Sequence, residues 1–141
     1  MLNEIITANQ LSLVISQAAA PAFLLGAIAS FLSVLVSHMS RIADRIHAVD
    51  AMTGDARKGA QALWSSLQVR AKLVHRAIYW AVGSGICTCL LMIVAFVTAY
   101  LGLRHEPGAV LLFTLSLGLF SASLISFARE VHMALNERNL G

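Results

Sequence analysis

Three long stretches without a charged residue or a histidine constrain the fold of this chain more than any other feature. They cover residues 5–37, 77–103 and 107–128 and are 33, 27 and 22 residues long. A helix crosses a hydrocarbon core of about 30 Å with about 20 apolar residues, so each stretch is long enough to span a membrane. Only 12% of the 141 residues are charged. Soluble domains carry about 25%, and disordered chains are rich in charge, so both classes are excluded.

We therefore predict an all-α integral membrane protein with a single domain. The expected transmembrane helices are residues 21–37, 78–102 and 108–128. Residues 1–19 are too polar for the bilayer centre, and we expect them to form an amphipathic segment that lies in the interface. Pro21 would then open the first span, because a missing N–H is no loss at the start of a helix.

The basic residues are concentrated between the first two predicted spans. Seven of the ten Lys and Arg residues lie there, two follow the third span, and one lies in the short second loop. The positive-inside rule places residues 38–77 and the tail 129–141 in the cytoplasm and the N-terminus outside. No basic run has the density or the interleaved aromatic residues that nucleic-acid binding requires, so we expect no nucleic-acid partner.

Residues 38–77 have a helical pattern rather than a loop-like one. An apolar stripe continues the first helix inward through Ile42, Ile46 and Val49. Gly54 suits a turn, and from Ala56 a second apolar face runs directly into the second span. These two arms predict a cytoplasmic antiparallel hairpin that projects about 20–30 Å. Trp64 would close this hairpin or pack it against neighbours.

The first predicted helix carries a stripe of small and hydroxyl-bearing residues. The stripe consists of Gly26, Ser30, Ser33, Ser37, Ser40 and Asp44. At 100° per residue its members lie within about 40° of one line. Small residues let helices pack closely, and serine hydroxyls bond across such contacts. Alternatively, a serine-lined path that ends in a ring of Asp44 carboxylates can form a cation pore in a symmetric oligomer. The sequence leaves both interpretations open.

Charged residues also gather where the spans meet the predicted cytoplasmic side. A polar network at this level could hold the hairpin to the membrane domain, and its candidate members are Arg41, Arg76, Arg129 and Glu130. The alternative is that the arginines extend to lipid phosphates.

Three histidines lie at similar depth, each at the cytoplasmic end of a different span. They are His38, His75 and His132. Histidine titrates near neutral pH and binds metals, so a metal or proton-sensing cluster is conceivable. No carboxylate at ligand spacing accompanies them. We therefore expect interfacial side chains, with no metal and no cofactor.

Several short motifs are similar to those of a known family. They are Pro21-Ala-Phe-Leu-Leu-Gly, Arg41-Ile-Ala-Asp-Arg, Arg70-Ala-Lys-Leu-Val-His-Arg-Ala-Ile and Phe127-Ala-Arg-Glu-Val. Together they resemble a family of small bacterial inner-membrane proteins known only as a domain of unknown function, over nearly the whole chain. The resemblance implies three membrane helices with a cytoplasmic helical hairpin. It implies no established activity and no catalytic residues.

The same patterns separate three classes of function. The spans contain no Asp, Glu, Lys, Arg or His, and the chain has no phosphate-binding loop or nucleophile–base pair, so we expect no enzyme and no proton-coupled transporter.

The first hypothesis is a homo-oligomer that forms a passive, channel-like pore lined by the first helix. The alternative is a non-catalytic structural or accessory subunit that organises partners, such as another membrane protein, through its hairpin. A small membrane enzyme or metal-binding protein ranks third. Burial of the stripe within its own protomer would exclude the pore.

Overall fold

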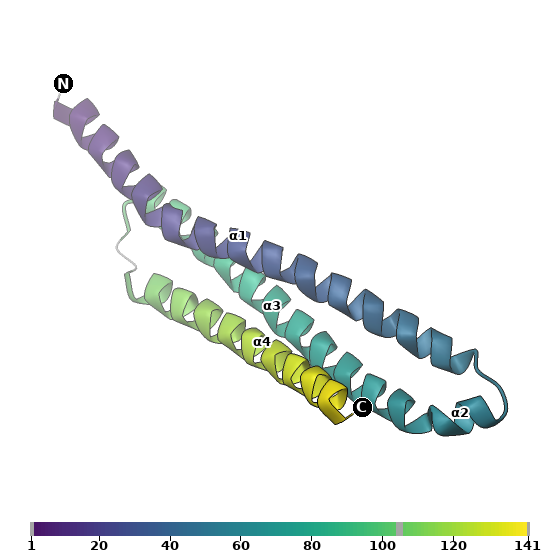
Figure 1. Ribbon diagram of the computed structural model, residues 1–141. Helices are drawn as coiled ribbons and strands as arrows, with labels where there is room; N and C mark the ends of the chain where they lie inside the picture. The colour runs from purple at the N-terminus through teal and green to yellow at the C-terminus, as the bar shows by residue number, and fades with distance from the viewer. Residues whose placement is uncertain (1, 104–105, 141) are drawn as a thin grey trace.

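The computed structural model describes residues 2–103 and 106–140, and these residues form four helices and no strand (Figure 1). The helices are α1 (Leu2–Asp50), α2 (Asp55–Gly59), α3 (Gln61–Leu101) and α4 (Glu106–Leu140). Three of them, α1, α3 and α4, are long and apolar enough to cross a membrane. The predicted all-α architecture with three candidate membrane helices is thereby confirmed.

The first helix continues without interruption from its apolar part into its charged part, and the chain turns back after Asp50. Gly54 takes a φ of 70°, in the left-handed region that favours glycine, just before α2 begins. The sequence predicted a single second arm from Ala56. In the structure α2 ends at Gly59, and α3 begins separately at Gln61. Glycine is a poor former of helix interiors, which explains the interruption at this point.

Pro21 lies inside α1 rather than at the start of a helix. The sequence predicted a separate segment over residues 1–19, whereas α1 is helical from Leu2 onward. Proline has no N–H, so the carbonyl of Gln17 lacks its usual helical partner. Helices in membrane proteins tolerate this loss when their surroundings compensate for it. The N-terminal part of α1 extends beyond the ends of α3 and α4 (Figure 1).

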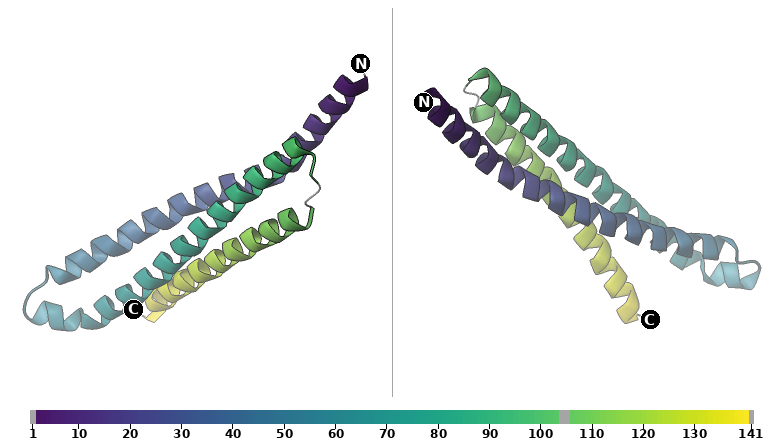
Figure 2. Two further views of the ribbon diagram at one scale, coloured as in Figure 1. Left: turned by 180° about the vertical axis from the view of Figure 1, so that it is seen from behind. Right: turned by 90° about the horizontal axis from the view of Figure 1, so that it is seen from above.

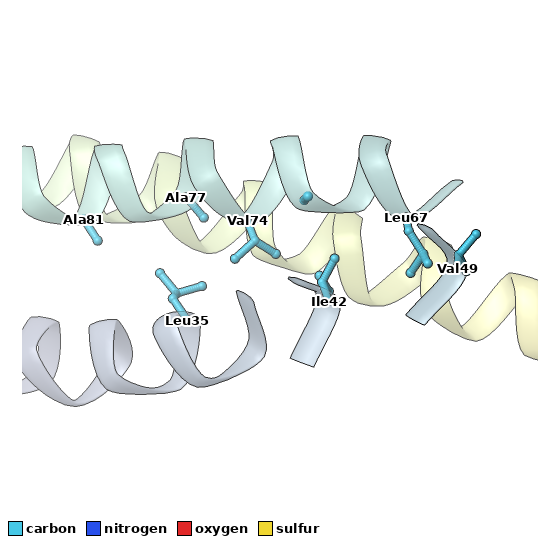
Figure 3. Packing of buried hydrophobic residues seen from close by; sticks show 8 residues of the cluster. Leu35, Ile42, Val49, Leu67, Val74, Ala77 and Ala81 are labelled. Carbon is cyan, nitrogen blue, oxygen red and sulfur yellow. The ribbon is translucent and has the colours of Figure 1, made fainter. Parts of the chain in front are cut away.

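The central helix of the bundle is α3, which packs on both α1 and α4, whereas α1 and α4 contact each other at few places (Figure 2). Where α1 meets α3, the buried residues recur every seven positions. They are Ile28, Leu35, Ile42 and Val49 on α1, and Leu67, Val74 and Ala81 on α3. A seven-residue repeat is typical of helices that pack as in a coiled coil. Val49 lies beside Leu67, and Ile42 lies near Val74 (Figure 3). We call this contact the apolar seam.

The outer surface of the long helices is also apolar. Phe23, Leu111 and Tyr100 are exposed over 81%, 71% and 91% of their surface. Soluble monomers rarely expose large continuous apolar patches, and a lipid environment removes that cost. This surface and the lengths of the three helices are those of a multi-pass membrane protein.

Candidate functional site

The contact between α3 and α4 contains a line of buried polar residues, unlike the apolar seam. The fully buried positions of α4 are Ser116, Ser123 and Glu130, which are seven residues apart. Their partners on α3 are Ser84, Ala77 and Arg70, which are seven apart in the opposite direction. Three pairs therefore follow one another over 14 residues, or about 21 Å of helix. We call this contact the polar seam.

Hydroxyl groups join the two helices at the end of the polar seam that lies deeper in the charge-free stretches. The Oγ of Ser84 donates to the carbonyl oxygen of Ser116 (2.7 Å), and the Oγ of Ser116 donates to the carbonyl oxygen of Ser84 (3.0 Å). Thr88 Oγ1 donates to the same Ser84 carbonyl at 2.9 Å. One heptad along, Ser123 Oγ donates to the carbonyl oxygen of Ala77 at 2.6 Å. These bonds satisfy buried hydroxyls that lipid could not.

The other end of the polar seam is a cluster of charges in which all three long helices meet. Arg70 Nε of α3 donates to Glu130 Oε1 of α4 at 2.8 Å. His38 Nε2 of α1 lies 2.7 Å from Glu130 Oε2. Arg70 Nη1 also lies 3.7 Å from Glu137 Oε2. We call His38, Arg70, Glu130 and Glu137 the charge cluster, with Glu130 at its centre.

Because Glu130 is buried, its carboxylate needs these partners to compensate for the loss of water. Its exposed fraction is 0%, and that of Arg70 is 6%. A buried carboxylate costs several kcal/mol unless a counter-charge and hydrogen bonds compensate for it. Among the described residues, Glu130 Oε2 and His38 Nε2 lie 2.7 Å apart, and neither atom forms a hydrogen bond with any other group. The cluster therefore couples α1 to the α3–α4 pair through one carboxylate.

Aromatic rings hold His38 in this position. The His38 ring lies edge to face against Phe127 of α4, with centroids 5.5 Å apart. Phe31 lies one heptad before His38 and contacts Phe120 and Phe127 in the same way, at 5.6 Å each. Edge-to-face aromatic pairs are favourable beyond the area that they bury. This short aromatic contact joins α1 to α4 and ends at the charge cluster.

The residues that form these contacts lie within a region recognised by a family model. That model, described as a protein of unknown function (DUF2721), matches residues 18–140. The chain belongs to the DUF2721 family. The resemblance to a domain of unknown function is thereby confirmed. Comparisons with curated proteins and with solved structures gave no match.

In this DUF2721 protein, the predicted network residues separate into one buried member and three exposed ones. Glu130 joins the helices, but its partners are His38 and Arg70 rather than the predicted Arg41 or Arg76. Arg41, Arg76 and Arg129 are exposed. Each precedes a buried residue by one position, and one residue turns a helix by about 100°, which carries its side chain out of the seam.

The three histidines occupy different surroundings. His38 belongs to the charge cluster, whereas His75 and His132 are exposed on α3 and α4. Within residues 2–103 and 106–140, no group of three or more His, Cys, Asp or Glu side chains could hold a metal ion.

All six members of the small-residue stripe are exposed on α1. Each lies two residues before or after Ile28, Leu35 or Ile42 of the apolar seam, so the stripe is turned by about 200° from that seam. A Cβ added at Gly26 would meet nothing within 4 Å. The stripe is therefore not buried against α3 or α4 of its own protomer, which is the arrangement that would have excluded a pore.

Sequence reasoning missed Arg70, Ser84 and Ser116. The missing signal is a repeat of seven that brings polar residues into register on both helices, at 70, 77 and 84 of α3 and at 116, 123 and 130 of α4. Considered by depth alone, Arg70 is one of several basic residues near the membrane boundary. Considered by helical phase, it shares a face with Ala77 and Ser84.

Proposed function

We propose that this protein is a non-enzymatic membrane subunit that self-associates through the outer face of α1 and forms a passive, channel-like pore. The observation that carries this proposal is the exposure of the whole stripe from Gly26 to Asp44, on the side of α1 opposite the apolar seam. A second copy of the chain would cover this face.

The repeat of the stripe supports assembly between copies. Its members form two series with steps of seven, one through residues 26, 33 and 40 and one through residues 30, 37 and 44. This is the repeat by which α1 already packs on α3, so another α1 can pack on the opposite face with similar geometry. Glycine and serine allow a close approach of the two backbones.

Three or more copies would surround an axis lined by serine hydroxyls. Ser30, Ser33 and Ser37 would lie along it, and Asp44 would form a ring of carboxylates at the hairpin end. Hydroxyl and carboxylate rings are found in cation pores. Within each protomer the serine hydroxyls of the polar seam are engaged in hydrogen bonds between α3 and α4. A water-filled path would therefore run between protomers.

We further propose the orientation of the chain in a bacterial inner membrane. Seven of the ten Lys and Arg residues lie in residues 38–77, which supports a cytoplasmic hairpin and C-terminus and an external N-terminus. An Arg57→Cys variant should react with an impermeant thiol reagent in inverted membrane vesicles and not in right-side-out vesicles. The opposite pattern would reverse the orientation.

Cysteine cross-linking tests the pore. In a background with Cys87→Ala and Cys89→Ala, a Ser33→Cys variant should form disulfide-linked dimers in membranes. Leu111→Cys, on the exposed face of α4, is the matched control and should stay monomeric. In proteoliposomes, a hydrophilic thiol reagent should modify Ser33→Cys and reduce potassium flux. Cross-linking without modification or flux would indicate dry packing and refute the pore, and absence of cross-linking would refute assembly through this face.

An accessory role is the second candidate, and the hairpin favours it. Leu63, Trp64 and Val69 lie outside the charge-free stretches and are exposed by 47%, 39% and 44%. We propose that they belong to one contiguous apolar patch, because patches of this kind on a water-exposed surface mark interaction sites. A stoichiometric membrane partner should co-purify with the wild type and be lost with Trp64→Ser. Purification of the chain alone as a stable oligomer would contradict this role.

A further inference from the structure

A shallow pocket of about 650 Å³ lies between α1 and α3, at the level where the charged hairpin passes into the second charge-free stretch. Met39 of α1 contributes to its apolar part. The polar and aromatic lining comes from α3 and consists of Lys72, His75, Arg76, Tyr79 and Trp80. This pocket shares no lining residue with the charge cluster or the stripe, so a ligand bound here does not depend on the proposed pore.

Its two cations lie on one face of α3. Lys72 and Arg76 are four residues apart and are both exposed, so their side chains are neighbours one turn apart. None of the described lining residues carries a carboxylate. The ion pairs formed in the described part of the chain engage His38 and Arg70, not these two residues. The pocket therefore offers two positive charges to a ligand.

Its aromatic residues lie one turn deeper. The rings of Tyr79 and Trp80 are edge to face with centroids 6.0 Å apart, just after the charge-free stretch begins at Ala77. Tyr and Trp are enriched where membrane meets water. The rise from Arg76 to Trp80 is about 6 Å, close to the thickness of the headgroup region on one side of a bilayer, about 5–7 Å.

We propose that this pocket binds an anionic phospholipid of the leaflet on the hairpin side. The lipid phosphate lies between the Lys72 ammonium and the Arg76 guanidinium, and the start of an acyl chain lies against Tyr79, Trp80 and Met39. Charge complementarity selects an anion, and the aromatic and apolar part selects one that carries a chain. A free phosphate would use only the first of these features.

Fluorescence of Trp80 in the full-length protein tests this site. The chain has two tryptophans, so Trp64→Phe leaves Trp80 as the only one. This variant is placed in phosphatidylcholine vesicles that contain a minor fraction of phosphatidylglycerol, with bromine on the chains of one lipid or the other. Bromine quenches tryptophan on contact. Brominated phosphatidylglycerol should quench Trp80 more strongly than an equal fraction of brominated phosphatidylcholine.

Substitution of the cations should remove this preference. In the Trp64→Phe background, Lys72→Gln with Arg76→Gln should weaken phosphatidylglycerol binding roughly thirtyfold, and either change alone roughly fivefold. Arg57→Gln with Lys58→Gln removes the same charge from α2, away from the pocket, and should preserve the preference. Both cations are exposed, so the helical circular dichroism should stay unchanged, and the single variants serve as the test if the double variant does not fold.

Three outcomes would overturn the proposal. Equal quenching by the two brominated lipids would mean that no anionic lipid is selected. An equal loss in the α2 control would mean that the general surface charge, rather than the pocket, attracts the lipid. Loss of the preference when inorganic phosphate is added in excess would identify a free anion as the occupant.

Discussion

Removal of one partner from the Arg70–Glu130 pair should destabilise the bundle strongly. An Arg70→Met variant keeps an unbranched apolar stem at this position and removes the charge of the side chain and its hydrogen bonds. Glu130 would then keep only the contact with His38 in a position that is 0% exposed. Breaking a buried ion pair by removing one member typically costs about 3–5 kcal/mol, because an uncompensated charge stays behind.

The contacts of Glu130 support a value in this range. The bond from Arg70 Nε is 2.8 Å long, and charge-assisted bonds contribute about 1.5–3 kcal/mol each. The desolvation cost of the carboxylate persists after the substitution. The contact between Arg70 Nη1 and Glu137 is longer, at 3.7 Å, and the side chain of Glu137 is 36% exposed, so screening makes its contribution small. We expect Arg70→Met to lower the free energy of unfolding by about 3 kcal/mol. This value is at the lower end of the range because Glu130 keeps its contact with His38.

The double variant Arg70→Met with Glu130→Met separates pairing from packing. Replacing a whole buried ion pair by apolar side chains of similar size is often neutral or stabilising by about 1–4 kcal/mol. We therefore expect most of the loss in Arg70→Met to be recovered. The difference between the double variant and the sum of the single variants gives the coupling energy.

Unfolding by sodium dodecyl sulfate in mixed micelles, followed by far-ultraviolet circular dichroism, measures these effects. Arg41→Met, at an exposed position just before buried Ile42, is the matched control and should change the free energy of unfolding by less than about 0.5 kcal/mol. An Arg70→Met variant that unfolds at the wild-type midpoint would refute the pairing. So would a double variant whose loss equals the sum of the single losses.

Three further substitutions test the seams by the same unfolding assay. Leu35→Ala opens a cavity in the apolar seam and should lower the free energy of unfolding by about 2–5 kcal/mol. Val36→Ala, on the exposed face, should lower it by less than about 0.5 kcal/mol, and equal losses would contradict the assigned face. Ala81→Leu overfills the same seam and should cost about 1–3 kcal/mol, so an unchanged midpoint would mean that α1 and α3 are not in close contact here. Ser116→Ala removes a hydroxyl bond to α3 and should lower the free energy of unfolding by about 1–2 kcal/mol, while Ser121→Ala, at an exposed position, should leave it unchanged. An unchanged free energy of unfolding in Ser116→Ala would contradict the polar seam.

The length and type of the helices could be predicted from the sequence because few physical alternatives exist. A stretch such as residues 77–103 offers no charge to a water-exposed surface, and in lipid only a helix satisfies its own backbone. The turn near Gly54 was predictable for a related reason, since glycine adopts the left-handed conformation found there. Pro21 was misleading, because its missing N–H is compatible with both the start and the interior of a helix in a membrane protein.

The partners of Glu130 could not be predicted from depth in the membrane. Arg76 and Arg129 lie at the expected depth. Each is one position before a buried residue, so its side chain points about 100° away from the buried face. Partner choice depends on the direction in which each side chain points, and that direction is fixed only when three helices pack together. The stripe on α1 shows the reverse case. Its line was evident from the sequence, but its exposure depends on which face of α1 meets α3.

The two seams contribute differently to the packing of the helices. The apolar seam holds α1 and α3 together, and the polar seam fixes the register of α4 along α3. In the apolar seam, every position at the step of seven is aliphatic, so a slip of one heptad still places apolar side chains against apolar side chains and changes only how well their sizes match. A slip of α4 along α3 in one direction would place Ser123 opposite Arg70, and the arginine would lose its carboxylate. A slip in the other direction would place Glu130 opposite Ala77, which leaves a buried charge without a partner. The hydroxyl pairs alone would not prevent either slip, because Ser116 and Ser123 are chemically equivalent. The Arg70–Glu130 pair thus makes one register of α4 much more favourable than its neighbours, and Glu130 extends that constraint to α1 through His38.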